Sequence, residues 1–426
     1  MKLVFGKVNV DLAFHLALSF IAFLIAVFPK LVVLGFICLF LTIFIGLKNK
    51  EIKFKLNSVF ILFISLYLCY VFGCFFTHHI STASKYLEYK LTFILVPILF
   101  SFRPDFRVKL AFPIVGSALG VFLASIFGIF KAFSVYYTSN CLFASFTSSN
   151  ICIDHPSYFS AIATFSVASV WYLRREKTLG FNGGLSYLFL SFTLIMIFLS
   201  YAMAAILFLL LCFSFFMLRW VYLKRIKWMS ISFFLFFPFL LIFLLSIVPA
   251  FKDEVNNSKV ALSNYLVNPT KFIQGNNKSL SGDQVRLVMW TVSIKTWAQH
   301  PFGVGTGNVD EYLSKELIHV GQFELAKLDQ NFEIKYNPHN QFLQIGIELG
   351  IIGIIVFLWS LFQTIKIGFR SQNWLLIFLV FCLIFNCLFE SMLQRQTGIV
   401  FFIFWICLLV VYSTSTNPYL DKRNIN

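Results

Sequence analysis

The sequence predicts an all-α polytopic membrane protein with about 12 transmembrane helices and a large, partly helical loop outside the membrane between spans nine and ten. The first observation is composition: of 426 residues, 59% are hydrophobic and 12% are charged, and the mean hydropathy is +0.83. The second is that the apolar residues form runs long enough to cross a hydrocarbon core of roughly 30 Å. Because these runs show no strand-like alternation and must satisfy their backbone hydrogen bonds in lipid, they indicate helices. A soluble cytosolic enzyme is excluded.

The expected spans divide the chain into three parts. They lie near residues 11–28, 31–47, 58–76, 91–102, 110–130, 157–173, 185–201, 202–218, 230–251, 341–362, 374–390 and 398–412. Spans one to nine fill residues 1–251, the loop covers 252–340, and the last three spans with a tail occupy 341–426. The first apolar run is followed by Pro29 and Lys30 without a small-residue cleavage site, so we expect it to remain as an anchor.

Positive charge is distributed unevenly along the chain, whose net charge is +16. If the N-terminus is cytoplasmic, the inner segments hold 20 Lys and Arg and the short outer loops hold 5. This asymmetry follows the positive-inside rule, so both termini are expected in the cytoplasm. The basic excess is therefore a topology signal, and no nucleic-acid partner is expected.

The loop 252–340 holds 9 Lys and Arg and 9 Asp and Glu, so it has no net charge and is expected to form a small folded cap outside the membrane. Its first part, 252–282, is rich in Asn, Ser, Lys and Gly and is expected to be irregular. The segment 284–299 has Arg286 and Trp290 at helical spacing, which predicts an amphipathic helix lying at the membrane interface.

The loop ends at His339, directly before the tenth span. The residues Asn337 and Pro338 suit an N-cap and a first helical position, which would place His339 in the first turn, beside amides that attract anions. The histidine is either an ordinary interfacial residue or a base that accepts a proton from an attacking hydroxyl. The residues alone leave both readings open.

The tenth span separates polar and small residues onto two faces. The polar face holds Asn340, Gln344 and Glu348. The other face holds Gly346, Gly350 and Gly353. The glycines allow close approach of a neighbouring helix, whereas the polar stripe must face protein or water because a carboxylate in lipid is costly.

Outward-facing cations suggest an anion site. Arg286 either snorkels from the interfacial helix or clamps a phosphate with its planar guanidinium. The cations that could join it are Lys85, Lys90 and Arg395. Several such charges close together on the outer side of the membrane would suit a pyrophosphate. Glu390, with Asn386 four residues earlier, either faces the same cavity as Arg395 or makes a helix-packing hydrogen bond.

Other polar patterns are less specific. The glycine-rich segment 300–308 lacks the preceding strand and the following Lys-Ser/Thr of a nucleotide loop, so it is interpreted as a tight turn that shapes the cap. His155 is interpreted as the start of the sixth span. Neither it nor the other outward histidines have partners at metal-ligand spacing, so no metal is expected. Cys141 and Cys152 either form an external disulfide or remain thiols.

These residues resemble the O-antigen ligase and polymerase superfamily of bacterial inner-membrane glycan transferases. The ligase signature of that family, a His, a small polar residue, nine residues and Gly-x-x-Gly, looks like His339, Asn340, Gly350 and Gly353. The upstream arginine, tryptophan and Pro-hydrophobic-Gly-x-Gly run of the family look like Arg286, Trp290 and residues 301–305. The resemblance is specific over about 284–353 and architectural elsewhere.

The resemblance implies transfer of a glycan from an undecaprenyl-pyrophosphate-linked donor to an acceptor hydroxyl, such as that of lipid A-core, on the periplasmic side of the membrane. No metal, nucleotide or other cofactor is implied. His339 would be the general base on the acceptor hydroxyl, and Arg286 would hold the pyrophosphate. Asn340 would orient the histidine or a sugar.

The chain departs from the family before the large loop, where members often carry a Ser-Arg pair. The corresponding stretch here begins at Ser200 and contains no arginine, so one expected phosphate ligand is missing. Lys90 or Arg395 would take its place, or the donor is held differently.

Three functions remain open from the sequence. A ligase would join the glycan to lipid A-core or, by the same chemistry, to a protein, and a polymerase would add it to a lipid-linked repeat. The spacing from His339 to Gly353 favours the ligase. A transporter predicts charges deep in several spans and broken helices, whereas the chain has mainly Glu348 and Glu390 in the outer half and Pro238 in span nine.

Overall fold

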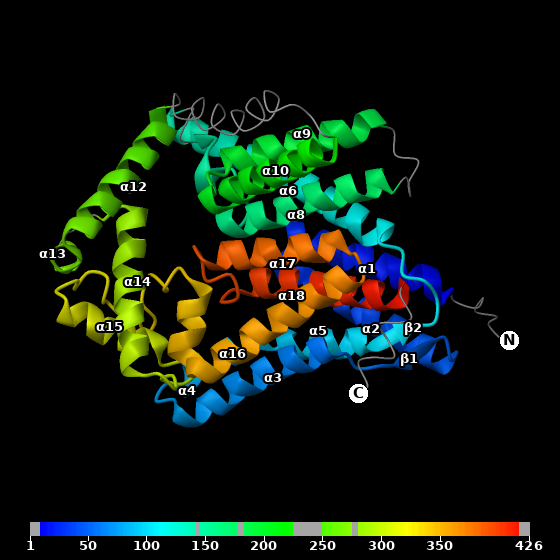
Figure 1. The fold of residues 1–426 in the computed structure, drawn as a ribbon, viewed down its shortest axis with the longest axis horizontal. Helices are drawn as coiled ribbons and strands as arrows, with labels where there is room; N and C mark the ends of the chain where they lie inside the picture. The colour runs from blue at the N-terminus through cyan, green and yellow to red at the C-terminus, as the bar shows by residue number, and fades with distance from the viewer. Residues whose placement is uncertain (1–8, 142–144, 177–182, 225–248, 275–279, 417–426) are drawn as a thin grey trace.

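The structure is a computed structural model that describes residues 9–141, 145–176, 183–224, 249–274 and 280–416. Figure 1 shows a bundle of long helices with a smaller helical cap at one end. The first part of the bundle comprises α1 (Val10–Val27), α2 (Val32–Lys48), α3 (Ser58–Gly73), α4 (Ile80–Lys90), α5 (Thr92–Ser101), α6 (Ala111–Ser139), α8 (Pro156–Arg175), α9 (Gly183–Leu199) and α10 (Met203–Lys224). The cap comprises α12 (Pro249–Val267), α13 (Pro269–Ile273), α14 (Gly282–Gln299) and α15 (Val309–His319). The bundle is completed by α16 (Gln341–Arg370), α17 (Trp374–Cys387) and α18 (Gln396–Thr416).

A short antiparallel pair of strands lies at the end of the bundle opposite the cap (Figure 1). The strands are β1 (Ile52–Phe54) and β2 (Phe102–Pro104), with Lys53 opposite Arg103. In the same view α1 begins and α18 ends at this side of the bundle. The cap and the described chain ends therefore lie at opposite ends of the helices.

The described residues confirm a helical membrane protein. Six helical segments are long and apolar enough to cross a membrane: α1, α2 with the short 3₁₀ turn Pro29–Leu31 before it, α3 with the 3₁₀ turn Cys74–Phe76 after it, α6, α16 and α18. The shorter apolar helices are α9, the stretch Met203–Phe215 of α10, and α17. The expected span 91–102 is the 10-residue helix α5, and span 230–251 lies almost wholly outside the described residues. The count of twelve stays a prediction.

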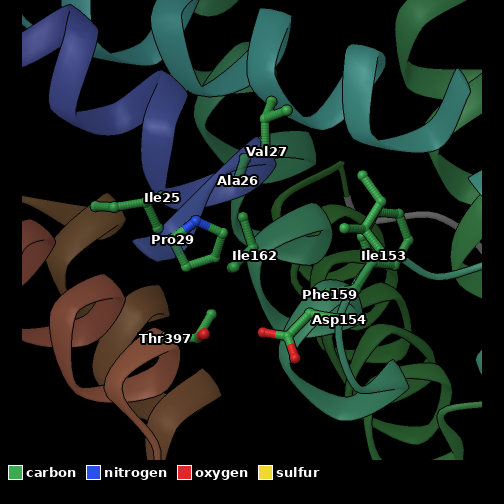
Figure 2. Close-up of a pocket in the computed structure, with 9 residues that line it drawn as sticks. All are labelled: Ile25, Ala26, Val27, Pro29, Ile153, Asp154, Phe159, Ile162 and Thr397. Atoms are coloured by element: carbon green, nitrogen blue, oxygen red, sulfur yellow. The ribbon is translucent and has the colours of Figure 1, made fainter. Parts of the chain in front are cut away.

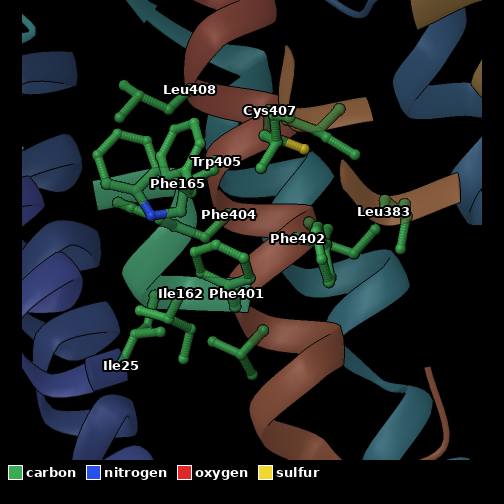
Figure 3. Packing of buried hydrophobic residues seen from close by; sticks show 14 of the residues in the cluster. Ile25, Ile162, Phe165, Leu383, Phe401, Phe402, Phe404, Trp405, Cys407 and Leu408 are labelled. Atoms are coloured by element: carbon green, nitrogen blue, oxygen red, sulfur yellow. The ribbon is translucent and has the colours of Figure 1, made fainter. Parts of the chain in front are cut away.

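The core of the bundle surrounds α18, the most enclosed of the six segments, with 94% of its most apolar stretch buried. Figure 3 shows Phe401, Phe404 and Trp405 from α18 packed beside Phe165 of α8. The ring centroids of Phe165 and Trp405 are 4.8 Å apart, with the edge of one ring toward the other at an interplanar angle of 62°. A helix that is apolar on all sides is stable only when protein or lipid covers every face, and here protein covers it.

The cap is more helical than the sequence predicts. The expectation that 252–282 is irregular is wrong for the described residues there, because α12 and α13 cover 249–273. The polar segment is helical because it packs on α14, with the Tyr265 hydroxyl 2.9 Å from that of Thr291. Helix α14 itself begins at a capping box in which Ser281 and Gln284 satisfy each other's backbone N–H groups.

The cap has a small apolar core that continues into the bundle. Its centre holds Val288 and Met289 from α14, Leu313 and Leu317 from α15, and Ile347 from α16. Because α16 contributes to both the main core and this smaller one, it fixes the position of the cap. Polar contacts with α4 add to this, and they are Tyr86 Oη to Asp310 Oδ2 at 3.2 Å, His79 Nε2 to Glu311 Oε2 at 2.9 Å and Lys85 Nζ to Glu333 Oε1 at 2.7 Å.

A break in α16 joins it to the glycine-rich turn. Gly350 has φ +67° and ψ −160°, so the helical ladder is interrupted there, and the backbone of Phe302 occupies the space where a Cβ would lie. The turn satisfies the groups that the break releases, through Val304 N to Ile347 O at 2.8 Å and Ile351 N to Pro301 O at 2.9 Å. The prediction that this segment forms a turn shaping the cap is confirmed. The missing Cβ of Gly350 leaves room for the backbone of Phe302 in the turn, and that of Gly346 leaves room for the ring of Trp297 from α14.

Candidate functional site

The candidate site lies where the cap joins the bundle, at the start of α16. The helix begins at Gln341, and its N-cap is Asn340, whose Oδ1 accepts from Phe342 N and Leu343 N at 2.9 and 3.1 Å. The expectation that Asn337 is the N-cap is therefore wrong. His339 adopts a left-handed backbone, φ +47°, which a helix cannot include. Asn337 instead accepts a hydrogen bond from His339 N at 2.9 Å.

The imidazole of His339 faces a carboxylate. Its Nδ1 lies 3.3 Å from Oε2 of Glu390, and the two side chains are 18% and 8% exposed. The backbone is also held, because Trp290 Nε1 donates to His339 O at 3.2 Å. When Nδ1 carries the proton and donates it to the carboxylate, Nε2 is the lone-pair nitrogen. A histidine oriented in this way can accept a proton from a third group.

Glu390 lies in the connection after α17, outside the membrane-spanning helices. Burial acts to raise the pKa of this carboxyl. The hydrogen bond and charge of His339, with the charges of His155 and Arg286, outweigh burial and hold its pKa below the usual value. Glu390 is therefore an ionised acceptor beside the imidazole. The charge of Arg286 on α14 thus acts on this carboxylate.

Residues 388–395, which we call the 388–395 loop, join α17 to α18 and are fixed from several directions. The backbone contacts are Asn340 Nδ2 to Leu388 O at 3.1 Å, Tyr158 Oη to Ser391 O at 3.2 Å and Leu393 N to Gln341 Oε1 at 2.6 Å. Two of these come from the first residues of α16. The start of α16 thus positions both His339 and the loop that carries its partner Glu390.

Two arginines lie on segments that contact the pair, Arg286 on α14 and Arg395 in the 388–395 loop. Arg286 Nη1 donates to Asp283 Oδ1 at 2.9 Å, while its Nε is buried without a hydrogen-bond partner among the described residues. Arg395 is exposed, with its guanidinium carbon 5.9 Å from the ring centroid of Tyr158. It makes no ion pair with the described part of the chain. Arg395 therefore has donors available for an anion, and Arg286 has one buried donor without a partner.

A second histidine lies beside the pair. His155 is the N-cap of α8, as the sequence predicts, with Nδ1 accepting from Ser157 N, and its ring contacts that of Tyr158 at 6.0 Å between centroids. Burial lowers its pKa, and the charge of Arg395 acts in the same direction against that of Glu390. His155 is therefore a neutral imidazole at neutral pH. The sequence predicted only that His155 starts α8, and not that it lies near His339 and Glu390.

Figure 2 shows a small cavity lined by the end of α1 with Pro29, by the segment before α8 and the start of α8, and by the first turn of α18. Its volume is about 10 Å³, close to the smallest that holds one water. Asp154 lines it, and its Oδ1 accepts from His155 N at 2.7 Å. This cavity is too small to hold a glycan.

The structure brings most of the expected site residues together. His339 contacts Glu390 directly, and the charge of Arg286 acts on the same carboxylate. Arg395 belongs to the 388–395 loop that carries Glu390, and Asn340 contacts that loop at Leu388. Lys90 lies apart from them and is fully buried, with Nζ 2.7 Å from Gln394 Oε1. Asn340 uses its amide group within the protein. The pairing of His339 with Glu390 was not predicted, because 51 residues separate them and only the folded structure brings the two segments together.

The structure also bears on three other expectations, for the polar stripe of α16, Ser200 and the two outer cysteines. The polar stripe of α16 faces protein, since Gln344 and Glu348 are both buried. Ser200, where the arginine of the Ser-Arg pair is missing, is buried and donates to Ile197 O at 2.6 Å. Cys141 and Cys152 are both free thiols.

The match with known proteins covers the region of this site. A comparison with curated proteins gave no match. Residues 186–358 match the family model described as O-antigen ligase, a range that includes Arg286, Trp290, His339 and the break at Gly350. The matched region starts within α9, takes in the whole cap and ends within α16. The match thus supports the O-antigen ligase superfamily for this region of the chain.

Proposed function

We propose that this protein is an O-antigen ligase that moves a glycan from undecaprenyl pyrophosphate to an acceptor hydroxyl of lipid A-core on the periplasmic side of the bacterial inner membrane. The observation that carries the proposal is the His339–Glu390 pair, held at the start of α16, with the charge of Arg286 acting on the Glu390 carboxylate. The O-antigen ligase match over residues 186–358 supports the reaction class.

In the proposed reaction, His339 is the general base. Nε2 takes the proton of the acceptor hydroxyl as that oxygen attacks the anomeric carbon of the donor sugar. The bond from the anomeric carbon to the pyrophosphate oxygen breaks, and its electron pair leaves with the pyrophosphate. The proton stays on the imidazole, whose positive charge Glu390 stabilises, and then passes to solvent. Such general-base catalysis typically raises the reaction rate by ~10²- to 10⁴-fold.

The arginines are proposed to hold the pyrophosphate. Negative charge grows on the leaving oxygen as the glycosidic bond breaks, so cations placed there stabilise the transition state more than the ground state. Arg395 has its donors available, and Arg286 has its buried Nε unpartnered. They would supply the charge that the missing Ser-Arg pair supplies elsewhere in the family.

The proposed orientation places the cap in the periplasm and both termini in the cytoplasm. The positive-inside distribution of Lys and Arg supports it. The arrangement in Figure 1, with the cap at one end and the described chain ends at the other, agrees with an even number of crossings.

The test begins with surface glycans and extracted lipid-linked intermediates from cells that lack the protein. Bare lipid A-core, with long chains accumulating on undecaprenyl pyrophosphate, supports the ligase. Core that carries a single repeat identifies the polymerase instead, and unchanged fractions refute both. Complementation with His339→Ala should leave the ligase defect in place, and His319→Ala, in α15 of the cap, is the matched control that should restore the product.

A further inference from the structure

Lys90 is the most enclosed cation among the described residues, because its side chain has no exposed surface. It ends α4, directly below the cap. The ammonium lies 4.5 Å from the ring centroid of Tyr70 and 4.9 Å from that of Tyr86. With no exposed surface, this cation does not contact a substrate at the outer face.

The charge of Lys90 is balanced by a buried carboxylate. Nζ lies 3.9 Å from Oε1 of Glu348 on α16, and that oxygen has no hydrogen-bond partner among the described residues. The other oxygen accepts from Gln344 Nε2 at 3.4 Å. Buried ion pairs add little net stability, because the cost of removing both charges from water offsets their attraction. Stability alone therefore does not account for a lysine in this place.

The short hydrogen bond of Lys90 points to another purpose. Nζ donates to Oε1 of Gln394 at 2.7 Å, and Gln394 belongs to the 388–395 loop. The neighbouring residue is Arg395, and Glu390 lies four positions earlier. Asn340, Tyr158 and Gln341 fix the loop from the other sides, so Lys90 is its anchor toward α4 and α5.

We propose that Lys90 is a positioning residue of the transferase, acting through Gln394 to fix the 388–395 loop and so the placement of Glu390 against His339. The proposal rests on the proposed function for its kinetic consequences. That Lys90 holds the loop on its side toward α4 and α5, through Gln394, does not depend on that function.

The kinetic test uses variants that break the link without leaving an unpaired charge. Lys90→Met with Glu348→Gln removes both charges, and Gln394→Met removes the acceptor. Because a displacement of about 1 Å can cost ~10²-fold, each should lower kcat by about 10- to 100-fold with KM for the lipid-linked donor little changed. The triple variant should lose no more kcat than the double variant Lys90→Met with Glu348→Gln. Gln394→Glu, which keeps an acceptor for Lys90, should retain most of the rate.

A second measurement is independent of turnover. Hydrogen exchange of the purified, detergent-solubilised protein should show faster exchange of backbone amides in 388–395 for both Gln394→Met and the Lys90 pair. Lys85→Met is the matched control, since Lys85 is also on α4 but contacts Glu333 of the cap, and it should leave exchange in this loop unchanged.

The outcomes separate the two proposals. A wild-type protein without transferase activity refutes the proposed function, while the exchange data still decide whether Lys90 fixes the loop. An active wild type whose variants show additive losses in kcat, or a raised KM at unchanged kcat, overturns the positioning role. Unchanged exchange in 388–395 for Gln394→Met, which leaves the Lys90–Glu348 pair intact, overturns it as well.

Discussion

Replacing Glu390 by glutamine tests the proposed mechanism most directly, because it removes the charge and keeps the shape. During transfer the imidazole becomes an imidazolium whose Nδ1 lies 3.3 Å from Glu390 Oε2. At an effective dielectric of about 20, that attraction is about 5 kcal/mol. Exposure of 18% and 8% for the two side chains lets water screen part of it, which leaves about 2 to 3 kcal/mol. This corresponds to a fall in kcat of about 30- to 150-fold.

The assay is transfer of glycan from a lipid-linked donor to purified lipid A-core by the protein in proteoliposomes. Glu324→Gln is a matched control on the cap surface, where the carboxylate pairs with Lys327, and it should leave kcat unchanged. The loss from Glu390→Gln should also vanish in a His339→Ala background, because the carboxylate acts through the imidazole. A Glu390→Gln variant within about threefold of the wild-type kcat would refute the reasoning.

Three further predictions concern the break, the cap junction and the arginines. Gly350→Ala should destabilise the protein by about 1 to 3 kcal/mol, measured by thermal unfolding, because its φ is +67° and Phe302 occupies the Cβ position, whereas Gly184→Ala, in open space, should not. Burial raises the pKa of Asp310 to about 7 from 3.8. The folded state therefore binds this proton more tightly, so its contribution to stability falls as pH rises from about 4 to 7, and Asp310→Asn should flatten that slope in unfolding experiments. Arg286→Ala and Arg395→Ala should each lower kcat/KM for the donor by about 10- to 100-fold in the transfer assay, with partial recovery by lysine.

Different results would contradict each of these. Equal melting temperatures for the two glycine variants would show that the break in α16 does not require glycine. If Asp310→Asn leaves the pH dependence of stability unchanged, the pKa of the Asp310 carboxyl does not differ between the folded and the unfolded state. If kcat/KM for the donor does not change in either arginine variant, the pyrophosphate is held elsewhere.

Local patterns in the sequence predicted the parts of the fold that depend on local physics. Apolar runs located α1 and α3 to within a few residues, and helical spacing of Arg286 and Trp290 placed both on α14. The turn at 301–305 also followed from composition. Such features depend on periodicity and turn chemistry, which neighbouring residues determine.

The sequence could not predict features decided by contacts between distant segments. Both Asn337 and Asn340 suit an N-cap, and the left-handed backbone of His339 between them determines which one caps α16. The polar segment that forms α12 is helical because it packs on α14, which composition does not reveal. Glu390 was visible as a polar residue near Arg395, but its pairing with His339 required the folded connection between α17 and α18.

The strain at His339 connects fold and chemistry. A left-handed non-glycine residue costs of order 1 to 3 kcal/mol and persists only where surrounding contacts over-determine it. Here Asn337 holds its N–H, Trp290 holds its carbonyl and Glu390 holds its ring. In this conformation the imidazole lies against the 388–395 loop, at Glu390. Since every supporting contact comes from a different segment, small shifts of the cap or the loop should change the orientation of the base before they unfold the protein.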